Sequence, residues 1–557
     1  MKNERLIYLP LGGAGEIGMN AYVYGYGKPG KERFILVDIG VTFPDMDTSP
    51  GVDLIFPDMS WLEKNANRLE AIFITHAHED HIGAIGHTFN KFHTPIYTRQ
   101  FTGAIARRKL AEHGIGAEAV TIMGAWPETV TVGPFEVGFM PVPHSIPEAS
   151  GMVIDTPKGR IVHTGDFKLD EEPGLGEPFS EAAWSAIAAG GVKALVCDST
   201  NIFSPEPGRS EASIGPAIQG LVASCTGMVV ATTFASNIAR VRTLAKAGVA
   251  AGRSVVLLGR AMDRMVSAGL ETGVVTDFPE VISADDARDL PRENLMLLVT
   301  GSQGERRAAS AQLSRGKYRG LKVRDGDTFL FSSKTIPGNE NGVARIINAY
   351  SEMGVDVIDD YAGRYHVSGH ANGPDLARVH QIMNPEMVIP MHGEHRHLRA
   401  HAKMAQAAGI ASVIAPNGAM VDLSGAAPEI VEYVEASRIY IDGNLHIGAM
   451  DGVVRDRIRM ALNGVVVVGV IIDEEDEVTG DAWAEVKGLA ETGKSRAPLV
   501  EEIEDAVNDT LSRAKRRVIS DDDAIEEEVR RSVRKICNDE IGKKPEVIVL
   551  VSRMVAA

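Results

Sequence analysis

The sequence predicts an α/β protein built from several domains. The chain has 557 residues, which is too long for a single hydrophobic core. Short β-branched apolar runs end repeatedly in polar turns, as buried strands do. In the middle of the chain and again near its end, such runs alternate with helical patterns, which is typical of α/β domains.

Composition and charge narrow the possible partners. The formal net charge of −18 argues against a general polyanion binder, so any nucleic-acid contact must be a local groove. Cys197, Cys225 and Cys537 are too widely spaced to indicate a disulfide framework or a thiolate metal site. Residues 1–5 contain no apolar segment of a secretory signal, and the most apolar run, 465–472, is too short to span a membrane. We expect a cytoplasmic protein without membrane contact.

The strongest chemical motif follows the apolar run 71–75, which is predicted to be a buried strand. It reads His76-Ala77-His78-Glu79-Asp80-His81 and places four potential metal ligands within six positions. Imidazole and carboxylate groups suit zinc or a similar cation, and a catalytic metal needs at least three protein ligands and an open position. Because only 16 residues of the chain are histidines, a chance His-rich loop is the weaker interpretation.

This motif resembles the His-x-His-x-Asp-His signature of the metallo-β-lactamase fold, and the later elements of that pattern follow in order. Asp38 ends the apolar run 34–37 and is expected to orient a ligand histidine. The ligand set that the resemblance implies is His76, His78 and His144 for one metal, Asp80, His81 and His392 for a second, and Asp166 as the bridge. It implies an αββα sandwich with two Zn²⁺ per chain, or Mn²⁺ in their place.

Two other features of the first part of the chain favour structural roles. The glycine run 11–18 lacks the Lys-Ser/Thr of a P-loop and is predicted to be a tight turn near the metal site. Asp45, Asp47 and Asp53 lie in acidic turns, where a solvated loop is favoured over a structural cation; a cation at Asp442 also stays open.

A parallel α/β domain is predicted between residues 211 and 362. Strand-like cores at 228–233, 254–258, 295–300 and 328–332 alternate with helical stretches at 237–251, 260–268 and 308–313. Since His392 must return to the metal site, this domain is inserted into the first one. The expected boundaries are 1–210 and 363–424 for the two parts of the metallo-β-lactamase domain, 211–362 for the insertion, 425–462 for a linker and 463–557 for a C-terminal domain.

The C-terminal domain is predicted to contain, in chain order, strand 465–472, helix 499–514, helix 523–539 and strand 546–551. It carries no candidate catalytic residue, which suggests a role in assembly. We expect a homodimer or homotetramer formed through this domain.

The inserted domain, which separates His392 from the other ligands, looks like that of the β-CASP group of nucleic-acid-processing enzymes. Asp198 in 196–201 and His370 in 366–370 match further motifs of this group. Together with the segments 234–237 and 332–340, these motifs resemble those of the ribonuclease J family of bacteria. The resemblance covers almost the whole chain. The stretch 442–451 departs from the usual family sequence.

The resemblance implies roles for these residues. A hydroxide activated by two metals attacks the phosphodiester, with Asp80 in the catalytic set. His370, oriented by Asp198, is the candidate general acid for the leaving 3′-oxygen, and a purely structural histidine is the alternative. Arg260, Arg264 and Lys334 could add charge. The expected substrate-binding residues are Phe234, Ala235, Ser236, Asn237, Ser332, Ser333, His366, Val367, Ser368, Gly369 and His370.

The predicted function is that of a ribonuclease acting on single-stranded RNA in rRNA processing, RNA maturation and mRNA decay. We expect 5′-to-3′ exonuclease activity that prefers 5′-monophosphate ends, together with endonuclease activity. The alternatives are a DNA-directed β-CASP nuclease and a small-molecule hydrolase of the metallo-β-lactamase fold. The insertion disfavours the second, because a small substrate needs no groove of that size. A catalytically silent subunit is not expected, since no ligand is missing.

Overall fold

The computed structural model describes residues 4–359 and 363–555. These residues fall into two compact units, one within Met1–Thr42 and Phe56–Arg438 and the other within Phe43–Ile55 and Ile439–Ala557. The predicted boundary at 362 falls within 360–362, which lie outside the described residues.

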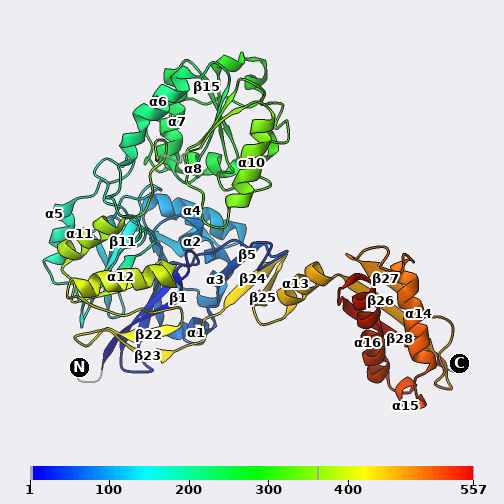
Figure 1. Cartoon of the computed structure of the whole chain (residues 1–557). Helices are drawn as coiled ribbons and strands as arrows, with labels where there is room; N and C mark the ends of the chain where they lie inside the picture. The colour runs from blue at the N-terminus through cyan, green and yellow to red at the C-terminus, as the bar shows by residue number, and fades with distance from the viewer. Residues whose placement is uncertain (1–3, 360–362, 556–557) are drawn as a thin grey trace. The chain divides into compact units, whose positions relative to one another are not determined.

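The first unit contains the predicted sandwich of two sheets (Figure 1). The first sheet has the strand order β23-β22-β1-β3-β4-β6-β7-β8, and the second has the order β21-β19-β13-β12-β11-β10-β9. In the first sheet the strands are β1 (Arg5–Gly12), β3 (Ala21–Gly27), β4 (Arg33–Val37), β6 (Leu69–Phe73), β7 (Ile96–Thr98), β8 (Val120–Ile122), β22 (Ala419–Asp422) and β23 (Glu429–Tyr433). In the second they are β9 (Thr129–Val132), β10 (Phe135–Pro141), β11 (Ser150–Thr156), β12 (Gly159–His163), β13 (Ala194–Asp198), β19 (Met387–Met391) and β21 (Ala411–Ser412).

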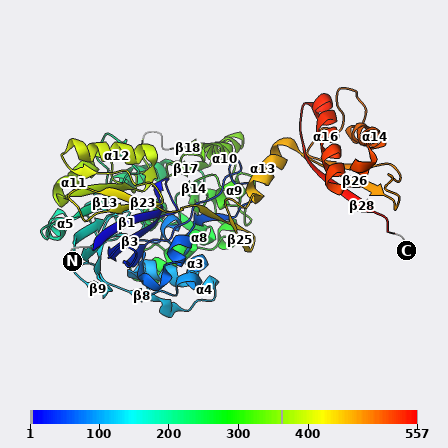
Figure 2. The same ribbon diagram turned by 90° about the horizontal axis from the view of Figure 1, so that it is seen from below.

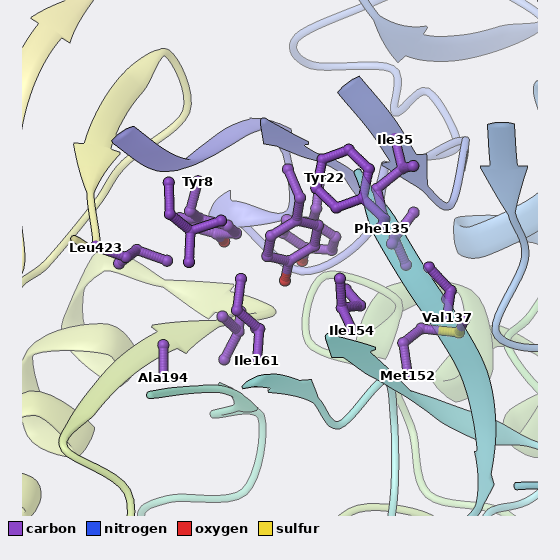
Figure 3. Close-up of a cluster of buried hydrophobic side chains, with 14 of the residues drawn as sticks. Tyr8, Tyr22, Ile35, Phe135, Val137, Met152, Ile154, Ile161, Ala194 and Leu423 are labelled. Atoms are coloured by element: carbon purple, nitrogen blue, oxygen red, sulfur yellow. The ribbon is translucent and has the colours of Figure 1, made fainter. Parts of the chain in front are cut away.

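The core of the sandwich lies between these two sheets. Figure 3 shows Tyr8, Tyr22 and Ile35 of the first sheet facing Ile154 and Ile161 of the second. All five side chains are fully buried, and removing apolar surface from water in this way is the main force that holds the sheets together.

Helices cover the outer faces of the sandwich, which confirms the αββα prediction. α12 packs on β19 through Leu398, Ala402 and Ala405, whose spacing places them on one helical face. The helices of this domain are α1 (Ser60–Glu63), α2 (Glu79–Ile82), α3 (Ile85–Phe92), α4 (Gln100–Glu112), α5 (Glu181–Ala188), α11 (Gly373–Met383) and α12 (His395–Ala407).

The inserted domain is a parallel sheet in the order β15-β16-β14-β17-β18, flanked by helices (Figures 1 and 2). Four of its strands match the predicted runs, whereas short, partly exposed β18 gave no signal. Its strands are β14 (Val229–Thr232), β15 (Ser254–Leu258), β16 (Leu295–Val299), β17 (Thr328–Phe331) and β18 (Asp356–Ile358). Its helices are α6 (Gly215–Ser224), α7 (Ile238–Ala250), α8 (Arg260–Glu271), α9 (Ala309–Leu313) and α10 (Glu340–Glu352).

The region 425–462 is more regular than the predicted linker. It contains β23, which extends the first sheet, then the β24 (Arg438–Asp442) and β25 (Leu445–Gly448) hairpin, and then α13 (Val453–Asn463). β24 also pairs with β5 (Leu54–Pro57). Near the acidic turns, Asp442 accepts a hydrogen bond from Arg457, and Asp53 accepts one from the Gly443 N–H.

The C-terminal domain has its own core beneath a three-stranded sheet ordered β27-β26-β28. Ile503, Val507 and Leu511 repeat at helical spacing along α14 (Leu499–Ser512), and their side chains are buried in this core. No helix among residues 4–359 and 363–555 has the length and apolar character needed to cross a membrane. The elements of this domain are β26 (Val465–Ile472), β27 (Trp483–Lys487), α14 (Leu499–Ser512), α15 (Arg516–Ile519), α16 (Asp522–Ile541) and β28 (Glu546–Arg553).

Candidate active site

The seven predicted metal ligands gather in two overlapping groups. The first is His76, His78, His144 and Asp166; the second is Asp80, His81, Asp166 and His392. Within each group the ligand atoms all lie within 4.8 Å of one another. β6 ends just before His76, and the loop that follows enters α2, which carries Asp80 and His81.

The distances place Asp166 between the two groups. Its Oδ2 atom lies 3.2 Å from Nε2 of His81, 3.8 Å from Nε2 of His144 and 3.9 Å from Nε2 of His76. The Oδ1 atom of Asp166 is buried and makes no hydrogen bond with the described residues. Imidazole nitrogens that converge with such a carboxylate form a donor set that suits zinc-like cations.

Asp38 and Thr75 fix the tautomers of two ligand histidines. Asp38 accepts hydrogen bonds from Nδ1 of His81 at 2.7 Å and from the Thr75 hydroxyl at 2.8 Å. Since the Thr75 hydroxyl donates to Asp38, its oxygen is free to accept from Nδ1 of His76, 3.0 Å away. Both histidines therefore carry a proton on Nδ1, which leaves Nε2 as the atom that would bind a cation.

The other ligand histidines are also held from behind. Nδ1 of His144 donates to the Gly369 carbonyl at 2.6 Å, so its Nε2 points toward Asp166. Nδ1 of His392 lies 3.0 Å from the Thr200 hydroxyl. Each contact fixes the ring orientation that ligation requires.

Charge and burial act in opposite directions on these histidines. Burial lowers the pKa values of His76 and His144. Burial alone would also lower the pKa of His392, but the Asp166 charge and hydrogen bonds with Asp198 and Asp80 raise it to about 10. A cation would use the same lone pairs as these protons, so metal binding releases protons from the site.

The glycine run forms the predicted tight turn beside the ligands. The His392 N–H donates to the Gly13 carbonyl at 2.7 Å, and β2 (Ala14–Gly15) pairs with β20 (Gly393–Glu394). Gly13 has a φ of +81°, and a Cβ atom there would lie 2.2 Å from the Tyr22 hydroxyl. The turn thus holds the backbone of His392, which itself has a φ of +48°.

His370 and Asp198 form a pair at the edge of the ligand groups. Oδ2 of Asp198 accepts a hydrogen bond from Nδ1 of His370 at 2.7 Å. Burial opposes protonation of His370, but the charges of Asp198 and Asp166 outweigh it and raise the pKa of the imidazole. Asp198 is fixed in turn by the N–H and hydroxyl of Thr200.

Some of the predicted substrate-binding side chains already make hydrogen bonds within the protein, whereas others keep a group that could bind a ligand. Ser332 is fully buried and donates its hydroxyl to the Tyr365 carbonyl, so this side chain does not face a ligand. The Asn237 side chain caps α7 by accepting from the Arg240 N–H. By contrast, the Ser333 hydroxyl is buried without a hydrogen-bond partner among the described residues.

The segment after 363 brings further predicted residues to this region. Ser368 accepts hydrogen bonds from the Asn201 amide and from the His370 N–H, which leaves its own hydroxyl proton to donate. A Cβ at Gly369 would lie 2.7 Å from Ser145 Oγ, so this position requires glycine. Val367 is buried.

The inserted domain reaches the metal ligands through the loop after β14. Ser236 Oγ lies 3.0 Å from Nε2 of His78, while Phe234 and Ala235 in the same loop are half-buried. Of the predicted cations, Arg264 pairs with Glu112 on the surface, and Arg260 and Lys334 are exposed.

Sequence reasoning missed three residues that support the site. Thr75 and Thr200 lie within the motifs but resemble ordinary turn residues. Arg240 is fully buried on α7 and pairs with Glu211. A cation within the apolar helical pattern of α7 was the available signal.

Comparisons with known proteins agree with this architecture. Residues 15–204 match the metallo-beta-lactamase superfamily and residues 362–416 match the Zn-dependent metallo-hydrolase RNA specificity domain. Residues 226–350 match the ribonuclease J beta-CASP domain and residues 452–554 match the ribonuclease J C-terminal domain. The fold and site therefore define a metal-dependent hydrolase of the metallo-β-lactamase fold with an inserted β-CASP domain.

Similarity to individual proteins extends over the whole chain. Ribonuclease J of Sinorhizobium meliloti is 39% identical over 558 residues, covering 99% of this chain and 98% of that protein. Ribonuclease J 1 of Streptococcus pyogenes is 36% identical, covering 85% of this chain and 84% of that protein. The chain belongs to the ribonuclease J family, as its motifs predict.

A crystal structure of an Enterococcus faecalis protein of unknown function matches the fold, with a TM-score of 0.52. It is 17% identical and covers 75% of this chain and 100% of that one.

Proposed function

We propose that the chain is a metal-dependent ribonuclease that hydrolyses single-stranded RNA. The observation that carries this proposal is the pair of ligand groups that share Asp166 beside the His370–Asp198 pair. When bound, two divalent cations, which we propose to be Zn²⁺ or Mn²⁺, would supply an activated water and neutralise charge on the phosphodiester. Family membership and the match to an RNA specificity domain support RNA as the substrate.

The proposed general acid is His370. Its Nδ1 proton is held by Asp198, so its Nε2 is the atom that can deliver a proton to the leaving 3′-oxygen. The ring centroid lies 5.0 Å from that of His144 and 5.6 Å from that of His392. This closeness to ligands of both groups supports a position over the scissile phosphate.

We propose that a second pocket, formed by Ser333, His366 and Ser368, holds a 5′-terminal monophosphate. Arg240, Lys334, Lys168 and Arg209 all add positive potential at His366. Among the described residues the Ser333 hydroxyl has no hydrogen-bond partner and the Ser368 hydroxyl keeps its proton, so both supply neutral donors. Such groups favour a phosphate, because charge-assisted hydrogen bonds are stronger than neutral ones.

A 5′ phosphate held in this pocket fixes the distance between the RNA end and the bond that is cleaved, and so accounts for 5′-to-3′ exonuclease action. If the pocket lies one nucleotide from the metals, each seated end releases one nucleotide per cut. Small residues that close around a monophosphate would crowd a triphosphate. The accompanying endonuclease activity cleaves internal bonds, so it does not depend on a terminal phosphate or on this pocket.

A digest of end-labelled substrates tests this function. We expect metal-dependent release of mononucleotides from 5′-monophosphorylated single-stranded RNA, slower attack on 5′-triphosphorylated RNA, and little cleavage of matched DNA. Equal cleavage of DNA would favour a DNA-directed β-CASP nuclease. Failure to cleave any nucleic acid would favour a small-molecule hydrolase.

We further propose that the protein works in the cytoplasm, in RNA maturation and mRNA decay.

We also propose that a second copy of the chain covers the outer face of the C-terminal sheet. Ile471, Trp483, Ile548 and Leu550 are each 44–50% exposed on that face. Ile471, Ile548 and Leu550 alternate with the buried residues of β26 and β28, and Trp483 lies on the neighbouring strand β27. An exposed apolar sheet face of this kind marks an interaction site, and symmetric dimers are the commonest soluble assembly.

A further inference from the structure

Arg240 is a fully buried cation whose donors are all directed at protein groups. Its Nε and Nη2 atoms donate to the two carboxylate oxygens of Glu211 at 2.5 and 2.8 Å. Its Nη1 atom donates to the Ser332 carbonyl at 2.9 Å and to the Ser332 hydroxyl at 3.1 Å. The same atom lies 3.4 Å from the Tyr365 carbonyl and 3.3 Å from Nδ1 of His366.

These contacts join three separate segments of the chain. Glu211 lies where the chain crosses into the inserted domain, and Tyr365 lies where it has returned to the sandwich. Ser332 follows β17 at the end of the inserted sheet. One guanidinium therefore ties both crossings to the end of that sheet.

The contact with His366 has a chemical consequence. A guanidinium has donors and no acceptor, so the Nδ1 atom that faces it must be an acceptor. The proton of neutral His366 is then on Nε2, where it can be donated to an anion.

The charges around His366 reinforce this state. Burial, followed by the charges of Arg240, Lys334, Lys168 and Arg209, lowers the pKa of His366 to about 3. Two of these cations are themselves paired, Arg240 with Glu211 and Lys168 with Asp170 at 2.7 Å. His366 therefore remains a neutral N–H donor throughout the physiological pH range.

We propose that Arg240 is a positioning residue for recognition of the RNA 5′ end, holding His366 as its Nε2–H tautomer and binding the two crossing segments together. It does not touch the substrate. This inference rests on the proposed phosphate pocket, and it adds a residue on the inserted domain that acts through His366. A merely structural ion pair would support all activities equally, whereas a positioning residue affects one activity selectively.

The test uses the full-length, metal-loaded protein. Arg240→Met is combined with Glu211→Gln, because removing the arginine alone would leave a buried carboxylate without a partner. The rate on 5′-monophosphorylated RNA is divided by the rate on 5′-triphosphorylated RNA, from pH 5.5 to 8.5. Histidine labelled with ¹⁵N reports the tautomer of His366, whose signal is assigned by its loss in His366→Gln.

In the double variant, the ratio of the rates on 5′-monophosphorylated and 5′-triphosphorylated RNA should fall by about tenfold or more, because His366 is no longer held in place. The rate of internal cleavage should change by less than about twofold. In the wild type, titration of His366 should contribute no pH dependence to the ratio. In the variant, the His366 pKa should rise because the Arg240 charge is gone, while burial still holds it below its ordinary value of about 6.5. The ¹⁵N signals should show a mixture of tautomers.

The matched control is Arg242→Met on the same helix, which removes an ion pair with Asp277 and a hydrogen bond to the Gly174 carbonyl and no contact with His366 among those described. Its ratio should equal that of the wild type. If the double variant does not fold, Arg240→Lys serves instead, because an ammonium cannot bridge both oxygens of Glu211 and reach His366; the same loss of ratio is expected.

An unchanged ratio with an unchanged tautomer would overturn the proposal, as would a parallel loss of internal and terminal cleavage. If the wild type itself shows no preference for a monophosphate, the pocket assignment fails. The tautomer measurement distinguishes that result, because it reports the effect of Arg240 on His366 without any activity.

Discussion

The hydroxyl of Ser236 lies 3.0 Å from Nε2 of His78. His78 belongs to the metal-binding loop of the sandwich, and Ser236 lies in the loop between β14 and α7 of the inserted domain. A side chain of the insertion thus orients a ligand that the sandwich supplies. The inserted domain therefore contributes a side chain to the proposed metal site.

Removing this contact should weaken metal binding. Ser236→Ala takes away the group that fixes the His78 ring, and loss of such a partner typically lowers metal affinity or activity by about 10- to 100-fold. The affinity is measured by titration with Zn²⁺ and by metal analysis after dialysis. Ser224→Ala, at an exposed serine of α6, is the control and should have no effect. Unchanged metal affinity in Ser236→Ala would mean that the contact is incidental.

Substitution of the proposed general acid should slow the chemical step without releasing metal. His370→Gln should reduce the cleavage rate by about 10²- to 10⁴-fold, the usual contribution of a positioned acid. Asp198→Asn should act in the same direction, because the neutral amide no longer supplies the charge that stabilises the protonated imidazole of His370. A substrate with a sulfur leaving group needs no proton and should restore much of the rate. Absence of that rescue would argue for a structural role of His370.

Damage to the phosphate pocket should separate terminal from internal cleavage. His366→Ala or Ser368→Ala should abolish the preference for 5′-monophosphorylated RNA and slow mononucleotide release, because each removes a proposed phosphate donor. Internal cleavage of a circular RNA, which has no ends, should continue. His395→Ala, at an exposed histidine at the start of α12, is the matched control. Variants that retain the wild-type ratio would show that the pocket lies elsewhere.

Removal of the C-terminal domain should change the assembly and leave the metal site intact. Deletion of the residues after Asn463 removes the exposed face that carries Trp483 and Leu550, and light scattering should then report a monomer. The double variant Trp483→Glu, Leu550→Glu should have the same effect in the full chain, since two charges would be buried in the proposed interface. A truncated protein that stays dimeric would place the interface in another part of the chain.

Much of the fold was predictable because its strands are short, apolar and β-branched. Predicted runs for β14, β15, β16 and β17 agree with the structure to within one or two residues. β18 and the hairpin in the predicted linker were missed, because partly exposed strands such as β18 carry no clear apolar pattern. Their pairing depends on neighbours that are distant in the sequence.

The candidate ligand histidines could be picked out from the sequence because motifs bring several chemical groups into a few positions, and the structure places them together. Their supports could not be picked out, because Thr75, Thr200 and Arg240 acquire their roles only when distant segments meet. Ser332 shows the converse case. It lies in a family-like motif, yet its hydroxyl is directed at the backbone of Tyr365. Sequence alone identifies which residue types gather, and the structure shows which of their atoms remain available.

The central claim is a dinuclear site bridged by Asp166. The most direct measurement is a titration of metal-free protein with Zn²⁺ or Mn²⁺, recording bound metal per chain and RNA cleavage in the same samples. We predict that cleavage reaches its maximum at two equivalents, and that Asp166→Ala binds less metal and loses activity while its circular dichroism spectrum stays unchanged. Full activity at one equivalent per chain would contradict the account.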